Sequence, residues 1–450
     1  MKNSPASTLQ LESLVSISVR IISTLLAFAI SIVLSRLLGA DGFGEYTFAL
    51  TVTMLVAVPL HTGLSHLSVR EVAARSKDLR DGWGRQLLSW TDRLAWSYFA
   101  FAAIFFGAAW LLMDAFNMRV NERILLAIAA GLVLVLTMPL TASRSSVLRG
   151  LGFANLGQLA DSILRPGILA LFLLLLSVCK FGSEVSPTSI MLLHGASGLI
   201  ALLVSVILLK KIVPITGTQP DGRGNAEWTR ALWPFYSVAA LQLLNSSIDV
   251  IALGALQPSE QVGIYKIAAQ LGALTSFGLM AINPILHGRF SRLYAANQID
   301  KLQNDVSRSL IYISALAAPP AFILLAFGEP LLAWAYGEEF AKGYLALQII
   351  VLGQMANVGF GAVAALLNMT GHERDTIFAM IAAAIANLLL NIMLIPYFGL
   401  VGAAIANAIS IFLWNVILWV RVRQRINIES SVWGLVSLLI AKISTKRGHQ

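Results

Sequence analysis

The apolar residues of this chain fall in long blocks separated by short polar connections. Each block has about twenty residues, the length at which a helix crosses a hydrocarbon layer of roughly 30 Å. Helices are expected because lipid cannot satisfy exposed backbone polar groups, whereas barrel strands would alternate over ten residues. The pattern predicts twelve spans, at about residues 13–38, 45–67, 87–113, 122–143, 156–180, 187–211, 233–256, 262–287, 309–334, 343–367, 376–397 and 400–420.

Composition agrees with this pattern. Hydrophobic residues make up 57% of the 450 residues and charged residues 12%, about half the charged share of a soluble protein. These values exclude a soluble enzyme and a disordered chain, and the single cysteine, Cys179, excludes an internal disulfide. The first apolar block is too long for a cleaved signal peptide and contains Arg20, so we expect an uncleaved first span. The predicted fold is an all-α polytopic membrane protein.

Basic residues are distributed unevenly between the two sets of connections. One set, together with both termini, holds 23 lysines and arginines, whereas the other holds only Arg119, Arg123, Lys180 and Lys342. By the positive-inside rule both termini are cytoplasmic, which requires an even number of spans: twelve, or fourteen. The same bias explains the net charge of +9 without nucleic acid as a partner.

The longest polar connection divides the chain into two halves of six spans. We expect an N-terminal lobe over 1–212, a cytoplasmic linker over 213–230, a C-terminal lobe over 231–424 and a tail over 425–450. The tail is either an interfacial helix, with Trp433 beside flanking lysines, or a frayed end.

The two halves share features at a constant offset. Gly44 and Gly263 lie 219 positions apart at the openings of spans 2 and 8, and Gly152 and Gly371 lie 219 apart before spans 5 and 11. Six spans per half place both halves in the same orientation, as two parallel six-helix bundles around a central cavity. This arrangement is typical of transporters that work by alternating access, although a duplicated bundle without a transport role has the same pattern.

Four segments resemble the polysaccharide flippases of the multidrug/oligosaccharidyl-lipid/polysaccharide exporter superfamily. They are LSRLLGADGFGEY (34–46), LRGLGFANLG (148–157), VGIYKIAAQ (262–270) and IPYFGLVGAAI (395–405). The resemblance implies a protein that moves an undecaprenyl-pyrophosphate-linked oligosaccharide from the inner to the outer leaflet of the bacterial inner membrane, for surface polysaccharide synthesis. Related branches move lipid II or export drugs, and twelve spans argue against the lipid II branch, whose members typically have fourteen.

Cationic residues inside spans are candidate ligands for the pyrophosphate. A charge at the bilayer centre costs at least about 2.5–3.5 kcal/mol, so such residues usually face an interior. The candidates are Arg20 in span 1, Lys266 in span 8 and Arg93 in span 3. Each has a structural alternative, because a long basic side chain near a span end can extend to the interface.

Carboxylates and amides inside spans are candidates for binding sugar or a coupling ion. Asp161 and Arg165 are four residues apart in span 5, as an intrahelical ion pair or as a proton-exchanging group and its partner. In span 7, helical spacing places Gln242, Asn245 and Asp249 on one polar face. The remaining candidates are Gln270 in span 8 and Asn387 and Asn391 in span 11. For the two asparagines of span 11, interhelical hydrogen bonding is the alternative.

No nucleotide or metal motif accompanies these residues. The sequence has no Walker A motif, GLG at 150–152 is not a dinucleotide loop, and the six histidines are scattered, so we predict no cofactor. Transport would then use an H⁺ or Na⁺ gradient or the substrate gradient, beside a polysaccharide polymerase. One alternative is a cation-coupled drug or small-molecule antiporter. The other is a membrane glycan polymerase or ligase, and the short outer connections argue against this enzyme.

Overall fold

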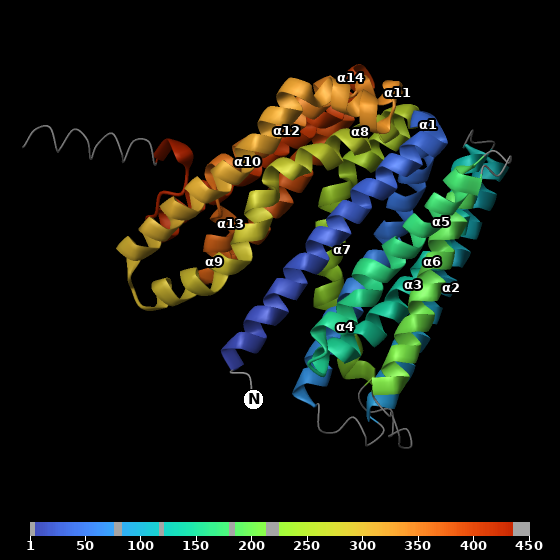
Figure 1. Ribbon diagram of the computed structural model, residues 1–450, viewed down its shortest axis with the longest axis horizontal. Coiled ribbons are helices and arrows are strands. Elements are labelled where there is room, and N and C mark those ends of the chain that lie inside the picture. The colour runs from blue at the N-terminus through green and yellow to red at the C-terminus, as the bar shows by residue number, and fades with distance from the viewer. Residues whose placement is uncertain (1–4, 76–82, 117–120, 180–184, 213–224, 435–450) are drawn as a thin grey trace, which may run out of the picture. The chain divides into compact units, whose positions relative to one another are not determined.

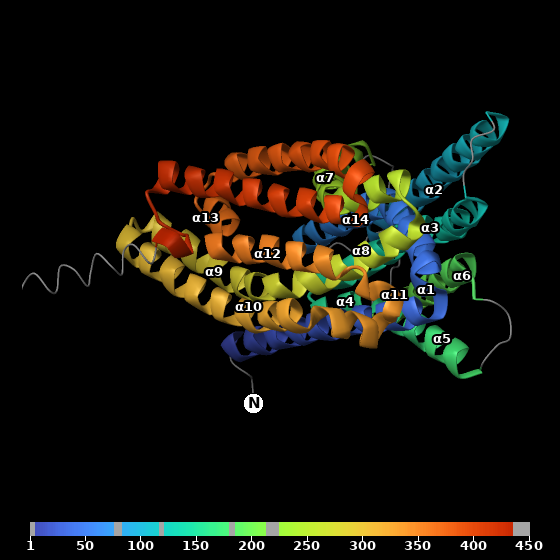
Figure 2. The ribbon, with the colours of Figure 1, turned by 90° about the horizontal axis from the view of Figure 1, so that it is seen from above.

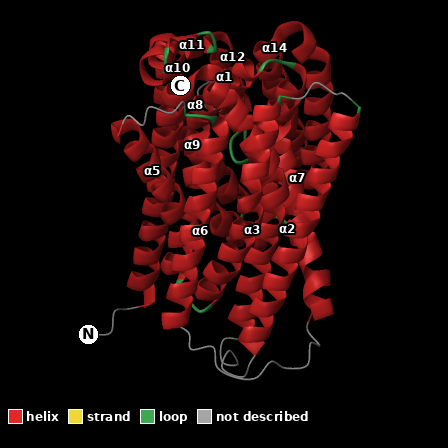
Figure 3. Cartoon of the chain, turned by 90° about the vertical axis from the view of Figure 1, so that its right-hand side faces the viewer, coloured by secondary structure: helices red, strands yellow, loops and turns green. Residues whose placement is uncertain are grey.

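The kink at Gly39 lets one helical segment hold two of the predicted spans. The computed structural model describes residues 5–75, 83–116, 121–179, 185–212 and 225–434, and within these residues every regular element is a helix (Figure 3). The backbone of helix α1 (Pro5–Ala74) departs from helical geometry at Gly39, where φ is 66°. Helix α14 (Glu373–Ile426) has the same kind of break at Gly399, where φ is 54°.

The number of spans follows from these breaks. Eight helices are long and apolar enough to cross a membrane, and two of them, in α1 and α14, have 54 residues each, about twice the length of one crossing. Two further spans are bent pairs of helices, with angles of 49° and 41°. Six single helices, two double ones and two bent pairs make twelve spans, so the predicted all-α fold with twelve spans is confirmed within the described residues.

The chain divides into two compact units, Met1–Ser247 and Ile248–Gln450. The boundary lies inside α7 (Asn225–Leu256), and residues 213–224 of the expected linker lie outside the described residues. The other helices of the first unit are α2 (Trp83–Ala115), α3 (Glu122–Gly150), α4 (Ala154–Leu159), the π-helix η1 (Ala160–Leu164), α5 (Arg165–Cys179) and α6 (Pro187–Ile212).

Helix α3 is the central helix of the first unit. It contacts α1, α2, α4 and α6 (Figure 1). Of its most apolar stretch, 67% is buried. An aromatic cluster at one end joins α2 to the first half of α7, because the indole of Trp228 lies 5.5 Å from that of Trp90 and 6.0 Å from that of Trp83. This packing places the start of α7 in the first unit.

The second unit is built around α12 (Tyr344–Phe360), which lies between α10 (Ile299–Tyr336) and α14 (Figure 2). Its core is formed by buried aliphatic and aromatic residues, among them Phe290, Leu302 and Leu418. The unit also contains α8 (Ser259–Gly272), the 3₁₀ helix η2 (Ala273–Ser276), α9 (Phe277–Ala295), α11 (Glu338–Ala341) and α13 (Val363–Met369).

The sequence repeat corresponds to a repeated backbone corner. Gly152 and Gly371 both adopt a left-handed conformation, with φ of 93° and 81°. The amide of Phe153 donates to the carbonyl of Leu148 at 2.9 Å, and the amide of His372 donates to the carbonyl of Leu367 at 2.9 Å. Donors and acceptors are again 219 positions apart. A six-to-one bond over a left-handed glycine is the Schellman helix end, so both halves end a helix in the same way.

The corner at Gly399 is also held by Gln261 of α8 and by Gln257, which lies between α7 and α8. The side-chain oxygen of Gln261 accepts from the amide of Leu400 at 2.8 Å, and Gln257 donates to the carbonyl of Ile395 at 2.9 Å. A Cβ at Gly399 would lie 2.2 Å from that Gln261 oxygen. The corner therefore requires glycine both for its backbone angles and for its space.

We predict that Gly399→Ala destabilises the protein by about 1–3 kcal/mol or more, because the backbone becomes strained and Gln261 is displaced. Thermal unfolding of the purified protein in detergent measures the loss. Gly107→Ala in α2 is the matched control, because its Cβ would have nothing within 4 Å. Equal unfolding temperatures for the two variants would contradict the role of the corner.

Candidate functional site

Asp249 is the centre of a buried polar network in the second unit. Its carboxylate accepts hydrogen bonds from Tyr265 at 2.7 Å, from Asn391 at 2.8 Å and from Asn407 at 2.7 Å. These donors come from α8 and from both halves of α14, on either side of the Gly399 corner. The side chain of Asp249 is 5% exposed and that of Asn391 is fully buried.

The network stabilises a carboxylate with neutral donors. Asn391 also donates to the backbone and side-chain oxygens of Asn387, both at 2.9 Å. Among the described residues Asp249 forms no ion pair, and the side-chain oxygen of Asn391 is buried without a hydrogen-bond partner. An unpaired buried oxygen beside a carboxylate is a position where water or a cation gains binding energy.

The predicted polar face of span 7 is only partly present. Gln242 is exposed and Asn245 is half-buried, whereas Asp249 is buried. Lys266 and Gln270 are half-buried in α8, where Lys266 directly follows the network residue Tyr265. The structure thus brings together Asp249, Asn387 and Asn391.

A second polar cluster lies in the first unit, at the junction of α3, α4 and η1. Arg149 donates through one terminal nitrogen to Ser65 at 2.6 Å and to Ser146 at 2.8 Å. Asp161 lies within electrostatic range of both Arg149 and Arg165. Within the part of the chain that the structure describes, three buried atoms of this cluster have no hydrogen-bond partner: the Nε of Arg149, one terminal nitrogen of Arg165 and the hydroxyl of Ser145.

The expected intrahelical pair of Asp161 with Arg165 is not formed. Neither side chain has an ion pair within 4.0 Å among the described residues. The reason is local: residues 160–164 are a π-helix, which changes the spacing so that residues four apart no longer face each other. Arg165 is left free to face other groups.

Glycines explain how the helices come close enough to build this cluster. A Cβ at Gly157 would lie 2.4 Å from the carbonyl oxygen of Ser145 and 2.5 Å from Cγ of Arg149, so only glycine lets α4 pack on α3 there. A Cβ at Gly150 would lie 2.7 Å from the side chain of Val72. The glycines of the LRGLGFANLG segment therefore place Arg149 beside η1.

Among the predicted cationic ligands, Arg93 lies outside both clusters. Arg93 is exposed and donates to the carbonyl of Ser89 at 3.3 Å, while its neighbour Asp92 pairs with Arg144 at 2.8 Å. Arg20 lies in α1, but its side chain is outside the described residues.

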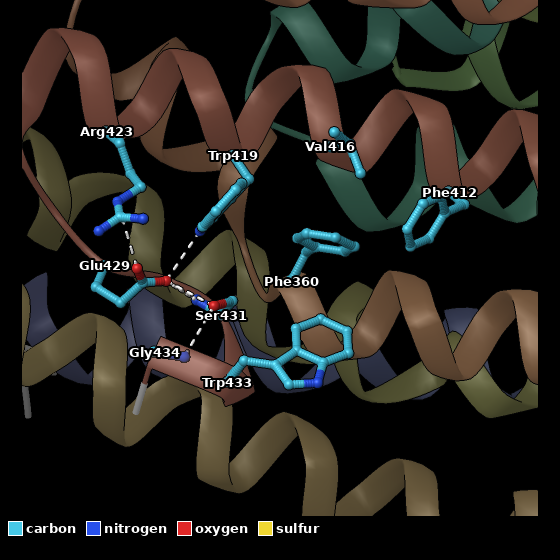
Figure 4. Close-up of a pocket in the computed structure, with 9 residues that line it drawn as sticks. All are labelled: Phe360, Phe412, Val416, Trp419, Arg423, Glu429, Ser431, Trp433 and Gly434. Atoms are coloured by element: carbon cyan, nitrogen blue, oxygen red, sulfur yellow. Dashed lines mark hydrogen bonds and ion pairs between the residues drawn. The ribbon is translucent and has the colours of Figure 1, made fainter. Parts of the chain in front are cut away.

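An aromatic pocket of about 500 Å³ lies beside the C-terminal end of α14 (Figure 4). Phe360, Phe412, Trp419 and Trp433 line it, and Glu429 lies at its polar end. The carboxylate of Glu429 accepts from the indole of Trp419 at 2.9 Å and from the amide and hydroxyl of Ser431 at 2.9 and 2.6 Å. Only residues up to 434 of the predicted tail helix are described.

Comparison with known proteins identifies the family. The model of the family described as "polysaccharide biosynthesis protein" matches residues 12–293, more than half of the chain. The chain belongs to this family. A second model, MatE, matches residues 234–396.

Individual relatives of this family member agree with that assignment. The chain is 29% identical over 169 residues to a probable low-salt glycan biosynthesis flippase of Haloferax volcanii, covering 37% of this chain and 35% of that one. It therefore spans about a third of the length of that relative. It is 22% identical over 419 residues to a putative O-antigen transporter of Shigella flexneri, covering 90% of this chain and 95% of that one.

A solved structure has the same fold. An inward-facing multidrug resistance MATE family transporter of the MOP superfamily superposes with a TM-score of 0.71 at 16% identity, over 92% of this chain and 98% of that one. The resemblance read from the sequence is thus confirmed at the level of family and fold, and the chain is a multi-pass integral membrane protein.

The sequence does not predict six residues of the two clusters: Arg149, Tyr265, Asn407, Ser65, Ser145 and Ser146. Arg149 lies at a span end, where cations are assigned to the connections, and Tyr265 belongs to the VGIYKIAAQ segment, which has no assigned chemical role. The available signals were the 219-residue repeat for Arg149 and the single asparagine in the small-residue stretch 400–410 for Asn407.

Glu429 gives the C-terminal segment a measurable pH dependence. Burial raises the pKa of Glu429, but the hydrogen bonds from Ser431 and Trp419 and the charge of Arg423 outweigh it and lower the pKa below its ordinary value. Because the folded-state pKa is lowered, the carboxylate stabilises the fold above about pH 4.3, and this contribution is lost as the pH falls further.

We predict that Glu429→Gln lowers the unfolding temperature at pH 7 and that the difference from the wild type disappears as the pH falls below about 4. Thermal unfolding in detergent from pH 7 to pH 3.5 measures this. Glu338→Gln is the control, since Glu338 is exposed and has no hydrogen bond or ion pair in the described residues. A pH-independent difference for Glu429→Gln would contradict the role of its charge.

Proposed function

We propose that the protein moves a polyprenyl-pyrophosphate-linked oligosaccharide from the cytoplasmic to the outer leaflet of the bacterial inner membrane. The glycan serves O-antigen, capsule or exopolysaccharide synthesis. Support comes from membership of the polysaccharide biosynthesis family, from relatives named as a glycan flippase and an O-antigen transporter, and from twelve spans. The division into two compact units supports alternating access as the mechanism.

The observation that carries the proposal is the arginine cluster of the first unit. Guanidinium groups bind phosphate oxygens through pairs of parallel donors. Among the described residues, Arg149 and Arg165 each have a buried N–H group without a partner, and both lie within electrostatic range of Asp161. Arg149 also donates to the hydroxyls of Ser65 and Ser146. Two cations with unused donors, within helices that cross a membrane, suit a ligand with two phosphates.

We propose Arg149 and Arg165 as pyrophosphate ligands in place of Arg93, because the side chain of Arg93 is exposed. Arg20 and Lys266 stay proposed pyrophosphate ligands.

We assign the driving force to Asp249 or Asp161. Asp249 is buried, unpaired with any cation in the described residues, and held by three neutral donors, which suits a carboxylate that exchanges H⁺ or Na⁺. The same observation favours the second candidate function, a cation-coupled drug or small-molecule antiporter. A polysaccharide polymerase is the proposed protein partner.

Reconstitution into liposomes tests the proposal. A labelled polyprenyl-pyrophosphate-linked oligosaccharide is placed in the membrane, and its accessibility to an impermeant enzyme is followed with time in each leaflet. We expect the wild type to move the lipid. We expect Arg149→Gln and Arg165→Gln to slow this at least tenfold, because each loses a charged phosphate contact.

Arg292→Gln is the control, because Arg292 is exposed and bonds only to the carbonyl of Gly288 in the described residues. Arg149→Lys separates charge from geometry: a rate between those of the wild type and Arg149→Gln indicates that the planar fork contributes. Unchanged movement in both glutamine variants would contradict the phosphate assignment. Transport of small cationic drugs without movement of the lipid would favour the antiporter.

A further inference from the structure

Two broken spans of the second unit meet at one small pocket. The span formed by α8, η2 and α9 bends by 49° at Pro284, and the span formed by α12 and α13 bends by 41° at Gly361, where φ is 72°. Broken helices in transporters expose backbone polar groups and mark binding sites in the membrane.

The pocket has a volume of about 220 Å³, and its polar lining is entirely neutral. Pockets for drug-sized ligands have about 300–1,000 Å³, so this smaller space suits a polar group no larger than about one sugar residue. No charged side chain lines it, so it lacks the cations that a phosphate requires. Its polar and aromatic lining residues are Ser276, Asn283, Asn357, Trp414 and Asn415.

The amides around the pocket have hydrogen-bonding capacity left. Asn415 donates to the side-chain oxygen of Asn357 at 2.9 Å and to the carbonyl of Ile411 at 2.9 Å. The side-chain oxygen of Asn283, directly before the break at Pro284, is buried and has no hydrogen-bond partner among the described residues. A buried acceptor without a partner costs about 1–3 kcal/mol, which a hydroxyl donor in the pocket recovers.

We propose that this pocket binds one neutral sugar residue of the transported glycan. Sugar hydroxyls both donate and accept, which matches the amides of Asn283 and Asn357, and the ring of Trp414 offers an apolar surface to the C–H face of a sugar. This inference rests on the proposed function and deepens it, because it locates the saccharide separately from the arginine cluster.

Equilibrium binding to the full-length protein in lipid nanodiscs tests the inference with two ligands. One is a polyprenyl-pyrophosphate-linked oligosaccharide, and the other is polyprenyl pyrophosphate without sugar. We expect Asn283→Leu to weaken binding of the glycan lipid about tenfold and to leave binding of the bare lipid unchanged. Asn304→Leu, at an exposed position of α10, is the matched control.

Asn283→Leu also distinguishes binding from folding. Because the oxygen that it removes is unpaired, the unfolding temperature stays equal to or above that of the wild type. An unchanged affinity for the glycan lipid would overturn the inference and leave only water in the pocket. Equal weakening for both ligands would overturn it as well. If the wild type binds neither lipid, the proposed function fails and the inference with it.

Discussion

The cost of placing polar groups inside apolar helices governs this structure. A charged side chain at the centre of a bilayer costs at least about 2.5–3.5 kcal/mol, and a buried polar atom without a partner costs about 1–3 kcal/mol. Hydrogen bonds from three neutral donors on two helices offset this cost for the Asp249 carboxylate. In the arginine cluster the cost is offset only partly, because among the described residues one N–H group each of Arg149 and Arg165 has no partner. A satisfied carboxylate and two unsatisfied cations suit different tasks, ion coupling and anion binding.

Glycine positions allow these clusters to form. Gly157 lets α4 approach Arg149, and Gly399 turns α14 so that Asn391 and Asn407 both reach Asp249. Gly152 and Gly371 end helices at equivalent places in the two halves with the same hydrogen bond. The motifs by which the chain resembles its family are therefore backbone corners, which explains why they consist of glycines and aromatics rather than chemically active residues.

The sequence predicts the spans well because a crossing needs about twenty apolar residues regardless of its neighbours. It also places Asp249, Asn387 and Asn391 among the polar candidates. Helical spacing alone puts Asn387 and Asn391 on one face of span 11, and puts Asp249 on the polar face of span 7. Spacing fails where a helix is irregular. The π-turn at 160–164 separates Asp161 from Arg165, and the partners Tyr265 and Asn407 depend on packing between helices that no periodicity contains. The sequence does not predict a binding role for Arg149, because the positive-inside rule assigns every cation near the end of a span to the polar connections.

Accessibility of the arginine cluster to a charged reagent tests directly whether the first unit contains a phosphate site. In a Cys179→Ser background, which removes the single native cysteine, Ser146→Cys introduces a thiol beside Arg149. We expect a membrane-impermeant sulfonate thiol reagent to label this position and polyprenyl pyrophosphate to slow the labelling. Ser146 and Ser309 of α10 are both buried in this conformation, so labelling of Ser146→Cys without labelling of Ser309→Cys reports that the arginine cluster opens during transport. Failure of Ser146→Cys to react, or labelling at the same rate with and without the lipid, would contradict a phosphate site in the first unit.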